Sequence, residues 1–168
     1  DEDRRVRRIN RAGEDFTGRS ADEAMGLRAG RAFRCVHSIN EDGGCGYGER
    51  CADCRVRMPV LDTFDTGRRH WREDASIPIG SGEDQRTIEV LVSTAPVQFP
   101  DNRLVAVWLE DVTALKEAKR RMERLAYEDP LTALANWRRL TEELPRMVAR
   151  AERYEHPFSL AIADLDGF

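Results

Sequence analysis

The sequence lacks long apolar runs, an excess of positive charge and a secretion signal. No segment of the 168 residues approaches the ~18–20 apolar residues that a membrane-spanning helix needs, and no signal-peptide pattern is present. With 27 Lys and Arg against 31 Asp and Glu, the net charge of -4 argues against nucleic acid as the main partner. These absences predict a cytoplasmic protein without a membrane segment.

Cysteine is also scarce, and all four cysteines lie in one glycine-rich segment. Four cysteines in a chain of this length are too few for a disulfide-dense secreted scaffold. They follow the spacing C-x9-C-x5-C-x2-C, at Cys35, Cys45, Cys51 and Cys54. Thiolates this close in sequence could bind Zn²⁺, ligate an iron–sulfur cluster or exchange disulfides, and free thiols are the further alternative. We expect a metal- or redox-responsive loop.

Local signals in the first part of the chain predict short helices. Residues 6–9 have a strand-like pattern, and residues 12–16 are expected to form a short helix. Ser20 and Glu23 have the spacing of a capping box, which predicts the start of a second helix. Apolar residues at helical spacing predict a longer helix over residues 56–64.

The pattern then changes to a period of two, which predicts three strands separated by turn sequences. These strands cover residues 71–79, 88–92 and 104–109. The third is nearly all apolar, so we expect it to be the most buried strand, with Trp108 on the face opposite Val105 and Val107. Three antiparallel strands with short helices indicate an α+β domain with one sheet.

A charged helix is predicted over residues 113–127, a second amphipathic helix over residues 137–154 and an apolar strand over residues 158–163. The first helix carries a narrow apolar stripe that suits packing against another helix. Packing against its own domain is the alternative. The stripe consists of Val112, Leu115, Ala118, Met122 and Leu125.

Four short motifs follow one another in the first two thirds of the chain. They are VRRINRA at residues 6–12, FTGRS at 16–20, EAMG at 23–26 and DVT at 111–113. In this order they resemble a PAS sensor domain, in which Asp-Ile/Val-Thr closes the last strand before an output helix. The resemblance implies a PAS domain over residues 1–112, with its first strand upstream of Asp1, and a helical signalling linker over residues 113–127.

The remainder of the chain holds two further motifs. LAYEDPLTALANWRR occupies residues 125–139, and the apolar residues 158–163 run into DLDGF at 164–168. The first motif resembles the opening of a GGDEF domain, Asp-x-Leu-Thr-Gly-Leu-x-Asn-Arg-Arg, and the second resembles its first strand and the Asp-x-Asp-x-Phe turn. Ala133 stands where that family has glycine, and Trp137 where it has the first arginine. The resemblance implies that residues 128–168 begin an α/β diguanylate cyclase domain.

The resemblance also assigns chemistry to the end of the chain. Asp164 would bind Mg²⁺ with help from the Leu165 carbonyl, and the amides of Gly167 and Phe168 would contact GTP phosphates. An acidic residue at a strand end, followed by a glycine turn, suits a hard cation and phosphate oxygens. Two such domains would each present one GTP to form cyclic di-GMP. The family's GGDEF hairpin lies beyond Phe168, so we expect these 168 residues alone to be catalytically inactive.

Together the motifs predict a homodimeric sensor that controls a diguanylate cyclase. Asp111, Thr113, Leu115 and Met122 are the predicted coupling residues, because they join the sheet to the linker helix or lie on its apolar stripe. A small molecule or a redox signal is the expected input. Flavin and haem are not expected, because the motifs that hold them in PAS domains have no match in this sequence. The alternative is a PAS interaction module with a degenerate, non-catalytic GGDEF scaffold.

Overall fold

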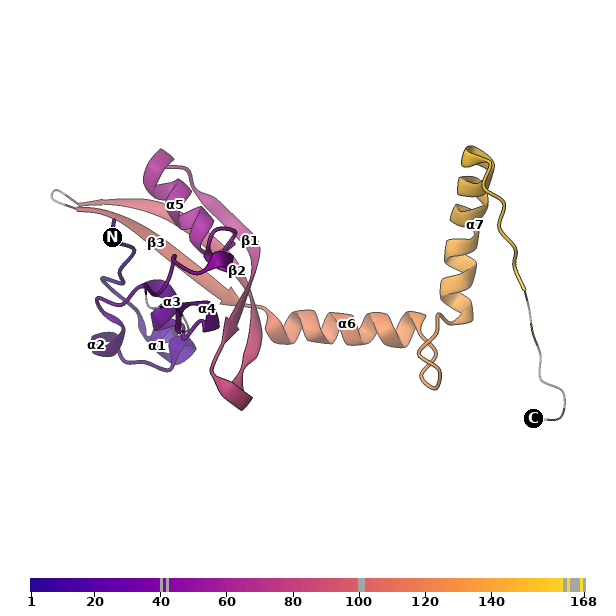
Figure 1. Ribbon diagram of the computed structural model, residues 1–168, viewed down its shortest axis with the longest axis horizontal. Coiled ribbons are helices and arrows are strands. Elements are labelled where there is room, and N and C mark those ends of the chain that lie inside the picture. Colours follow the sequence, from indigo (N-terminus) through magenta and orange to yellow (C-terminus); the bar gives the residue numbers. More distant parts are fainter. Residues whose placement is uncertain (40, 42, 100–101, 162, 164–166, 168) are drawn as a thin grey trace. The chain divides into compact units, whose positions relative to one another are not determined.

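The chain forms two units in the computed structural model, Asp1–Lys116 and Glu117–Phe168. The structure describes residues 1–39, 41, 43–99, 102–161, 163 and 167. Figure 1 shows the order of the elements along the chain. They are α1 (Arg11–Thr17), α2 (Ala21–Ala24), α3 (Ala29–Ala32), α4 (Val36–Ile39), the 3₁₀ turn η1 (Glu49–Cys51), α5 (Arg57–Thr66), β1 (His70–Ile79), η2 (Gly82–Asp84), β2 (Arg86–Phe99), β3 (Asn102–Asp111), α6 (Thr113–Tyr127) and α7 (Trp137–Tyr154).

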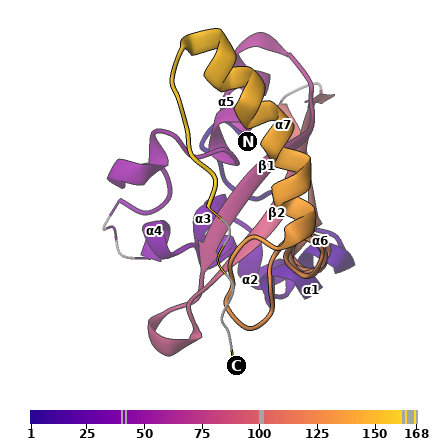
Figure 2. The same ribbon diagram turned by 90° about the vertical axis from the view of Figure 1, so that its right-hand side faces the viewer.

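The three strands form one antiparallel sheet in the order β1-β2-β3. Figure 2 shows β1 and β2 side by side. The apolar residues at period-two spacing on these two strands form the buried core, as the sequence pattern predicts. The core residues are Ala75, Ile77, Ile88, Val90 and Val92. The α+β class with one antiparallel sheet is therefore confirmed.

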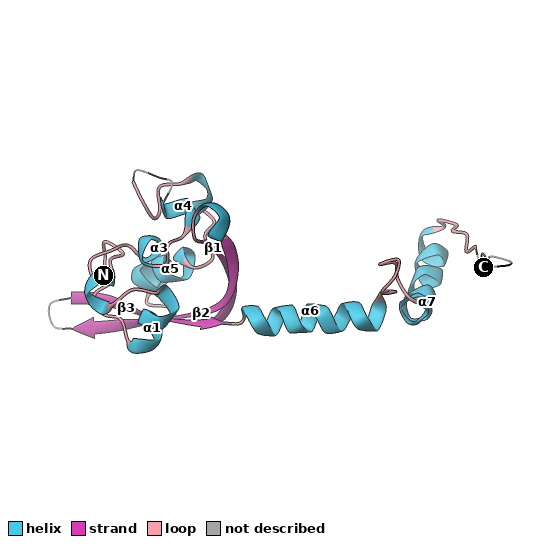
Figure 3. Ribbon diagram, turned by 90° about the horizontal axis from the view of Figure 1, so that it is seen from below, coloured by secondary structure: helices cyan, strands magenta, loops and turns pink. Residues whose placement is uncertain are grey.

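Helix α5 covers the buried face of this sheet. It contacts β2 and β3, and the hydroxyls of Thr63 on α5 and Thr94 on β2 share a hydrogen bond of 2.7 Å. Both threonines are 1 % exposed, and a buried hydroxyl without a partner is costly, so this bond helps fix the position of α5. Figure 3 shows α3, α4 and α5 on the same side of the strands.

The local helix signals predicted from the sequence are confirmed. The Ser20 hydroxyl accepts a hydrogen bond from the Glu23 backbone N–H, and the Glu23 carboxylate accepts one from Ser20, which makes the capping box of α2. Helix α1 ends at Gly18 and α5 ends at Gly67, both with a positive φ. Glycine adopts this left-handed conformation without the steric penalty of a Cβ, so these two residues set where the helices end.

The prediction that residues 104–109 are the most buried strand is wrong. Val107 and Trp108 of β3 are 41 % and 59 % exposed, whereas Val90 and Val92 of β2 are fully buried. Strand β2 lies between two partners, while β3 pairs along one edge only among the described residues. Apolar composition alone does not report which strand is central.

One smaller prediction in the first unit also fails, and one strand is irregular at its start. Residues 6–9 do not form a strand: Arg5 and Arg28 make an isolated bridge, and the Val6 N–H donates to the Leu27 carbonyl at 2.8 Å. Trp71 is 80 % exposed, because the pairing of β1 with β2 shifts between His70 and Glu73. A shift of one residue exchanges the two faces of a strand, so the alternation cannot be extended back to Trp71.

The second unit contains α7, whose predicted limits are confirmed. Residues 158–161 and 163 are not in a strand, which corrects the expected strand over residues 158–163. A strand needs a partner, and the described part of this unit has no second extended segment beside these residues. Among the described residues, no helix is both long and apolar enough to cross a membrane.

Candidate thiol cluster and coupling site

The four cysteines lie on the segment that leads from α3 to α5. Cys35 precedes α4, its N–H donates to the Gly30 carbonyl at 2.8 Å, and it forms an isolated bridge with Ile79 of β1. Cys51 ends η1 and is 6 % exposed, and Cys54 lies just before α5. The cysteine segment, residues 35–54, therefore contacts the end of β1 at Cys35 and leads into the start of α5 at Cys54.

All four cysteines are free thiols. Burial raises the pKa of the Cys35 thiol, and N–H groups of His37 and Ser38 that donate to its sulfur oppose this increase. Burial also raises the pKa of Cys45, opposed mainly by the N–H of Gly30. The nearby Cys54 and Cys45 raise the pKa of Cys35 further, and Cys51 and Cys54 raise the pKa of Cys45.

The four thiols do not form a coordination site in the described structure. In the described part of the chain, no three Cys, His, Asp or Glu side chains are grouped so that they could hold a metal ion as they are oriented. Metal binding and disulfide exchange therefore both stay predictions for this loop.

Two arginines donate hydrogen bonds to the backbone of the thiol loop, residues 35–54. Arg28 donates to the Cys45 carbonyl at 3.3 Å and Arg57 donates to the Cys51 carbonyl at 3.2 Å. A Cβ at Gly30 would lie 2.8 Å from the Cys45 sulfur, so a larger residue there would force the thiol or the helix to move. Glycine at this position therefore allows α3 to approach the thiol of Cys45.

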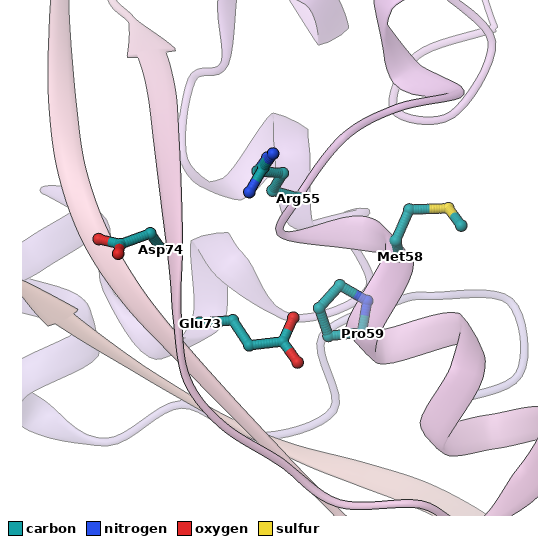
Figure 4. Close-up of a pocket in the computed structure, with 5 residues that line it drawn as sticks. All are labelled: Arg55, Met58, Pro59, Glu73 and Asp74. Atoms are coloured by element: carbon teal, nitrogen blue, oxygen red, sulfur yellow. The ribbon is translucent and has the colours of Figure 1, made fainter. Parts of the chain in front are cut away.

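A pocket with a volume of about 390 Å³ lies between the start of α5 and β1. It is lined by Arg55, Met58, Pro59, Glu73 and Asp74, and Figure 4 shows the Glu73 side chain reaching toward Pro59. Both carboxylates already have partners, because Glu73 binds His70 and Asp74 binds Lys116. Charged groups line this pocket, which suits a polar occupant better than an apolar one.

His70 links the end of α5 to the start of β1. Its Nε2 lies 2.7 Å from the Asp62 carboxylate and its Nδ1 lies 2.5 Å from the Glu73 carboxylate. The hydrogen bond with Glu73, followed by that with Asp62, raises the pKa of His70. The hydrogen bond with His70 lowers the pKa of Asp62, and the nearby charge of Arg68 lowers it further.

The junction between the sheet and α6 is a dense hydrogen-bond site. The Thr113 N–H donates to the Asp111 carboxylate at 2.9 Å, and the Thr113 hydroxyl accepts from the Glu89 N–H at 2.9 Å. The Val112 N–H donates to the Glu89 carbonyl at 2.9 Å, and Val112 is buried. The Asp-Val-Thr sequence thus fixes the start of α6 to the central strand, and it brings the Asp111 carboxylate and Thr113 together.

Lys116 adds a second connection between α6 and the sheet. Its Nζ lies 2.6 Å from the Asp74 carboxylate on β1 and 3.1 Å from the Glu89 carboxylate on β2. The hydrogen bond from Lys116 lowers the pKa of Asp74, and the same bond raises the pKa of Lys116. Sequence reasoning missed these three residues, because they lie far apart along the chain. The only available signal was that Lys116 is one of two lysines in an arginine-rich sequence.

The apolar stripe begins with the buried Val112, and three of its later members are exposed within their own units. Leu115, Met122 and Leu125 are 69 %, 71 % and 74 % exposed. Packing of this stripe against another helix and packing against its own domain therefore both stay predictions. Leu115 belongs to the first unit, next to Lys116 in the sequence, and Met122 belongs to the second unit.

The turn between α6 and α7 explains the residue types of the DPLTALAN motif. The Asp129 carboxylate accepts from the N–H and the hydroxyl of Thr132, at 2.9 and 2.8 Å, and these bonds lower the pKa of Asp129. Asn136 donates to the Ala126 carbonyl at 3.0 Å and accepts from the Arg139 N–H at 3.1 Å. Asp129, Thr132 and Asn136 therefore act as turn and helix-cap residues.

The predicted metal and phosphate ligands lie at the end of the chain. Asp164, Leu165 and Phe168 are outside the described residues. Gly167 lies in a turn with a φ of 77° and is exposed, and this conformation favours glycine.

No protein-family model matches the chain, and no curated protein matches it. The class is therefore defined by the structure: an α+β domain with a three-stranded antiparallel sheet, flanking helices and a C-terminal helix anchored to the central strand.

Proposed function

We propose that the chain is a PAS-type sensor domain joined by α6 to the beginning of a diguanylate cyclase domain. The observation that carries this proposal is the junction, where Asp111 and Thr113 connect the central strand to the first turn of α6. Such a site lets a small change in the sheet alter the position of the helix. The resemblance of residues 125–139 to the opening of a GGDEF domain supplies the identity of the output.

Lys116 makes the coupling sensitive to two strands at once. Its contacts with Asp74 and Glu89 hold α6 against β1 and β2, and Asp74 also lines the pocket beside α5. A signal that moves β1 relative to β2 would change both contacts and shift or rotate α6. Helix shifts of this kind are a common means of switching between two states.

The exposed stripe of α6 is proposed to form a parallel homodimer with a second copy. Apolar side chains at three- and four-residue spacing suit a seam between two helices. Cyclic di-GMP formation needs two nucleotides held face to face, so a dimer is also what the proposed output requires. In that output Mg²⁺ would neutralise phosphate charge, held by Asp164 and the Leu165 carbonyl, while Gly167 and Phe168 would donate backbone N–H groups.

The dimer is tested by placing a positive charge on the stripe. Leu115→Lys and Met122→Lys are expected to convert a sedimenting dimer into a monomer, because a lysine in the seam loses its hydration. Glu117→Lys places the same residue on the opposite side of α6 and is the matched control. A stripe variant that stays as dimeric as the control would refute the seam.

The output is tested in a protein in which this chain continues through a complete GGDEF domain. Conversion of GTP to cyclic di-GMP, abolished by Asp164→Asn, is the expected result. Thr113→Val should remove the response to the signal while the basal rate persists. The 168 residues alone should yield no product. Absence of turnover in the complete protein would instead favour the non-catalytic scaffold.

A further inference from the structure

We propose that His70 is a proton-operated switch, which bridges Asp62 and Glu73 when its ring carries two protons and releases Glu73 when the ring loses one. His70 and Glu73 belong to the start of β1, and Asp62 belongs to α5. The signal for this switch is the proton concentration. The inference concerns the first unit alone, so it holds whether or not the proposed cyclase output is correct.

Both ring nitrogens of His70 lie at hydrogen-bonding distance from a carboxylate. Nε2 is 2.7 Å from Asp62 Oδ2, and Nδ1 is 2.5 Å from Glu73 Oε1. Ionised carboxylates only accept hydrogen bonds and a neutral imidazole has a single N–H, so both bonds exist together only when the ring is protonated. In the neutral ring, one nitrogen would turn its lone pair toward a carboxylate oxygen, which repels it. The side chain of His70 is only 13 % exposed, so water does not readily separate the two groups.

A β-bulge places Glu73 where it can reach this ring. The pairing of β1 with β2 shifts between His70 and Glu73, because β1 has two residues there opposite the one residue Ser93. Residues three apart point to opposite faces of a regular strand, and the extra residue cancels this alternation. Arg72 lies in the bulge with a φ of 51°, which is uncommon for a residue with a Cβ, and its N–H donates to the Ser93 hydroxyl at 2.9 Å. Backbone strain of this kind is typical of places where a side chain has to be directed.

The two carboxylates are held unequally. The Asp62 side chain is 26 % exposed, and its carboxylate also accepts a hydrogen bond of 2.9 Å from the Arg68 guanidinium. The Glu73 side chain is 47 % exposed, and His70 is its only hydrogen-bond partner among the described residues. When the ring loses a proton, Glu73 can therefore turn toward water, whereas Arg68 keeps Asp62 in place. The remaining ring proton is expected on Nε2, bound to Asp62.

Charged groups around the ring set the direction of the response. They are Asp62 on α5, Arg68 just after α5, and Glu73 on β1, whereas the residue opposite His70 on β2 is the uncharged Thr94. The hydrogen bond with Glu73, followed by that with Asp62, raises the pKa of His70 above 6.5. The bridged state is therefore complete below about pH 6.5 and is lost as pH rises through the raised pKa.

Release of Glu73 affects both the pocket and the junction with α6. Glu73 lines the pocket between α5 and β1, where its side chain reaches toward Pro59 (Figure 4). The next residue, Asp74, lies 2.6 Å from Lys116 Nζ of α6. A movement of β1 at Glu73 thus reaches this contact through a single peptide unit. Loss of one proton from His70 is thereby transmitted to the contact that joins the sheet to α6.

The test follows the 168-residue chain by NMR as the pH is raised from about 5 to 9. We expect His70 to titrate with a midpoint above pH 6.5 and to end as the tautomer protonated on Nε2, which ring nitrogen shifts identify. The backbone amides of Asp74 and Lys116 should shift with the same midpoint. Glu73→Gln should lower the His70 midpoint by about 1–2 pH units and abolish the shifts at Asp74 and Lys116. Glu83→Gln, which removes a carboxylate from η2 in the same unit, is the matched control and should keep the parent midpoint.

His70→Gln cannot titrate, so the shared transition at Asp74 and Lys116 should be absent from it. His37→Gln replaces another histidine of the first unit and should keep the transition. A His70 midpoint at or below pH 6.5, or a high-pH tautomer protonated on Nδ1, would overturn the proposal. So would a titration of His70 that leaves Asp74 and Lys116 unchanged. These three outcomes are measured on the parent chain, so they decide the proposal even if a variant does not fold.

Discussion

Ala133 has a backbone conformation that is uncommon for a residue with a Cβ. Its φ is 56°, at the position where the GGDEF family has glycine. The left-handed region costs an L-residue roughly 1–2 kcal/mol, so Ala133→Gly should raise the free energy of unfolding of this turn by up to about 1 kcal/mol after the greater entropy of unfolded glycine is subtracted. Urea unfolding followed by circular dichroism measures the change.

Ala135→Gly is the control for this substitution, because Ala135 lies two residues away and has no positive φ. It should be neutral or destabilising, since glycine gains only flexibility there. If both variants had the same stability, strain at Ala133 would not be the reason for the gain.

His70 makes the first unit depend on pH. Its folded pKa is raised above 6.5 by Glu73 and Asp62, so protonated His70 contributes stability that is fully present below about pH 6.5 and is lost as pH rises through the raised pKa. The charged groups that face it are these two carboxylates and Arg68, which binds Asp62. The pKa of Asp62 is lowered, so its contribution is lost only as pH falls below its ordinary value of 3.8.

His70→Gln is therefore expected to flatten the decline in melting temperature between about pH 6.5 and 8. His156→Gln, which replaces an exposed histidine of the second unit, should keep the parent pH dependence. Thermal melts of the three proteins across this range decide the matter. Equal slopes for the parent and His70→Gln would show that the histidine does not carry the effect.

At the scale of elements, sequence reasoning succeeded where the signal is local. The capping box of α2 and the helical stretches of α1 and α5 depend on residues that are close along the chain, and all three were predicted. The burial of β3 was not, because it depends on which strand becomes central. The bulge that exposes Trp71 has no local signature of its own in the alternating pattern.

In the candidate sites, too, local signals were found and contacts between distant residues were missed. Asp111 and Thr113 were identified from a motif, but their partner Glu89 lies 24 residues from Thr113 and belongs to another strand. Asp74 lies still further from Lys116 along the chain. Pairings across this distance are set by the register of the sheet, which a single sequence does not specify.

Thr113→Val tests the anchoring of α6. It removes the hydroxyl that accepts from the Glu89 N–H, so the free energy of unfolding of the first unit should fall by about 1 kcal/mol. Hydrogen exchange should also become faster in the first turn of α6. Thr141→Val removes a hydroxyl that bonds only within α7, and it should change little. Unchanged exchange at the start of α6 would contradict the anchor.

At the scale of the whole molecule, the two units should lose stability separately. Ile88 is 5 % exposed in the core of the sheet, and Ile88→Ala should cost the first unit about 2–5 kcal/mol through the cavity it creates. Hydrogen exchange followed by mass spectrometry should show faster exchange in β1, β2 and β3, and unchanged exchange in α7. Met147→Ala, at a half-exposed position of α7, serves as the opposite control. Loss of protection in α7 with Ile88→Ala would show that the units unfold together.

The exposure of Trp71 and Trp108 has an optical consequence. Trp137 is 71 % exposed as well, so all three tryptophans of the chain contact water in the described structure. The native monomer should therefore fluoresce at long wavelengths, close to an unfolded chain, and denaturation should shift its emission little. A shift to shorter wavelength, when it occurs, would report another surface covering an indole, which makes the intrinsic emission of this protein a sensor of association.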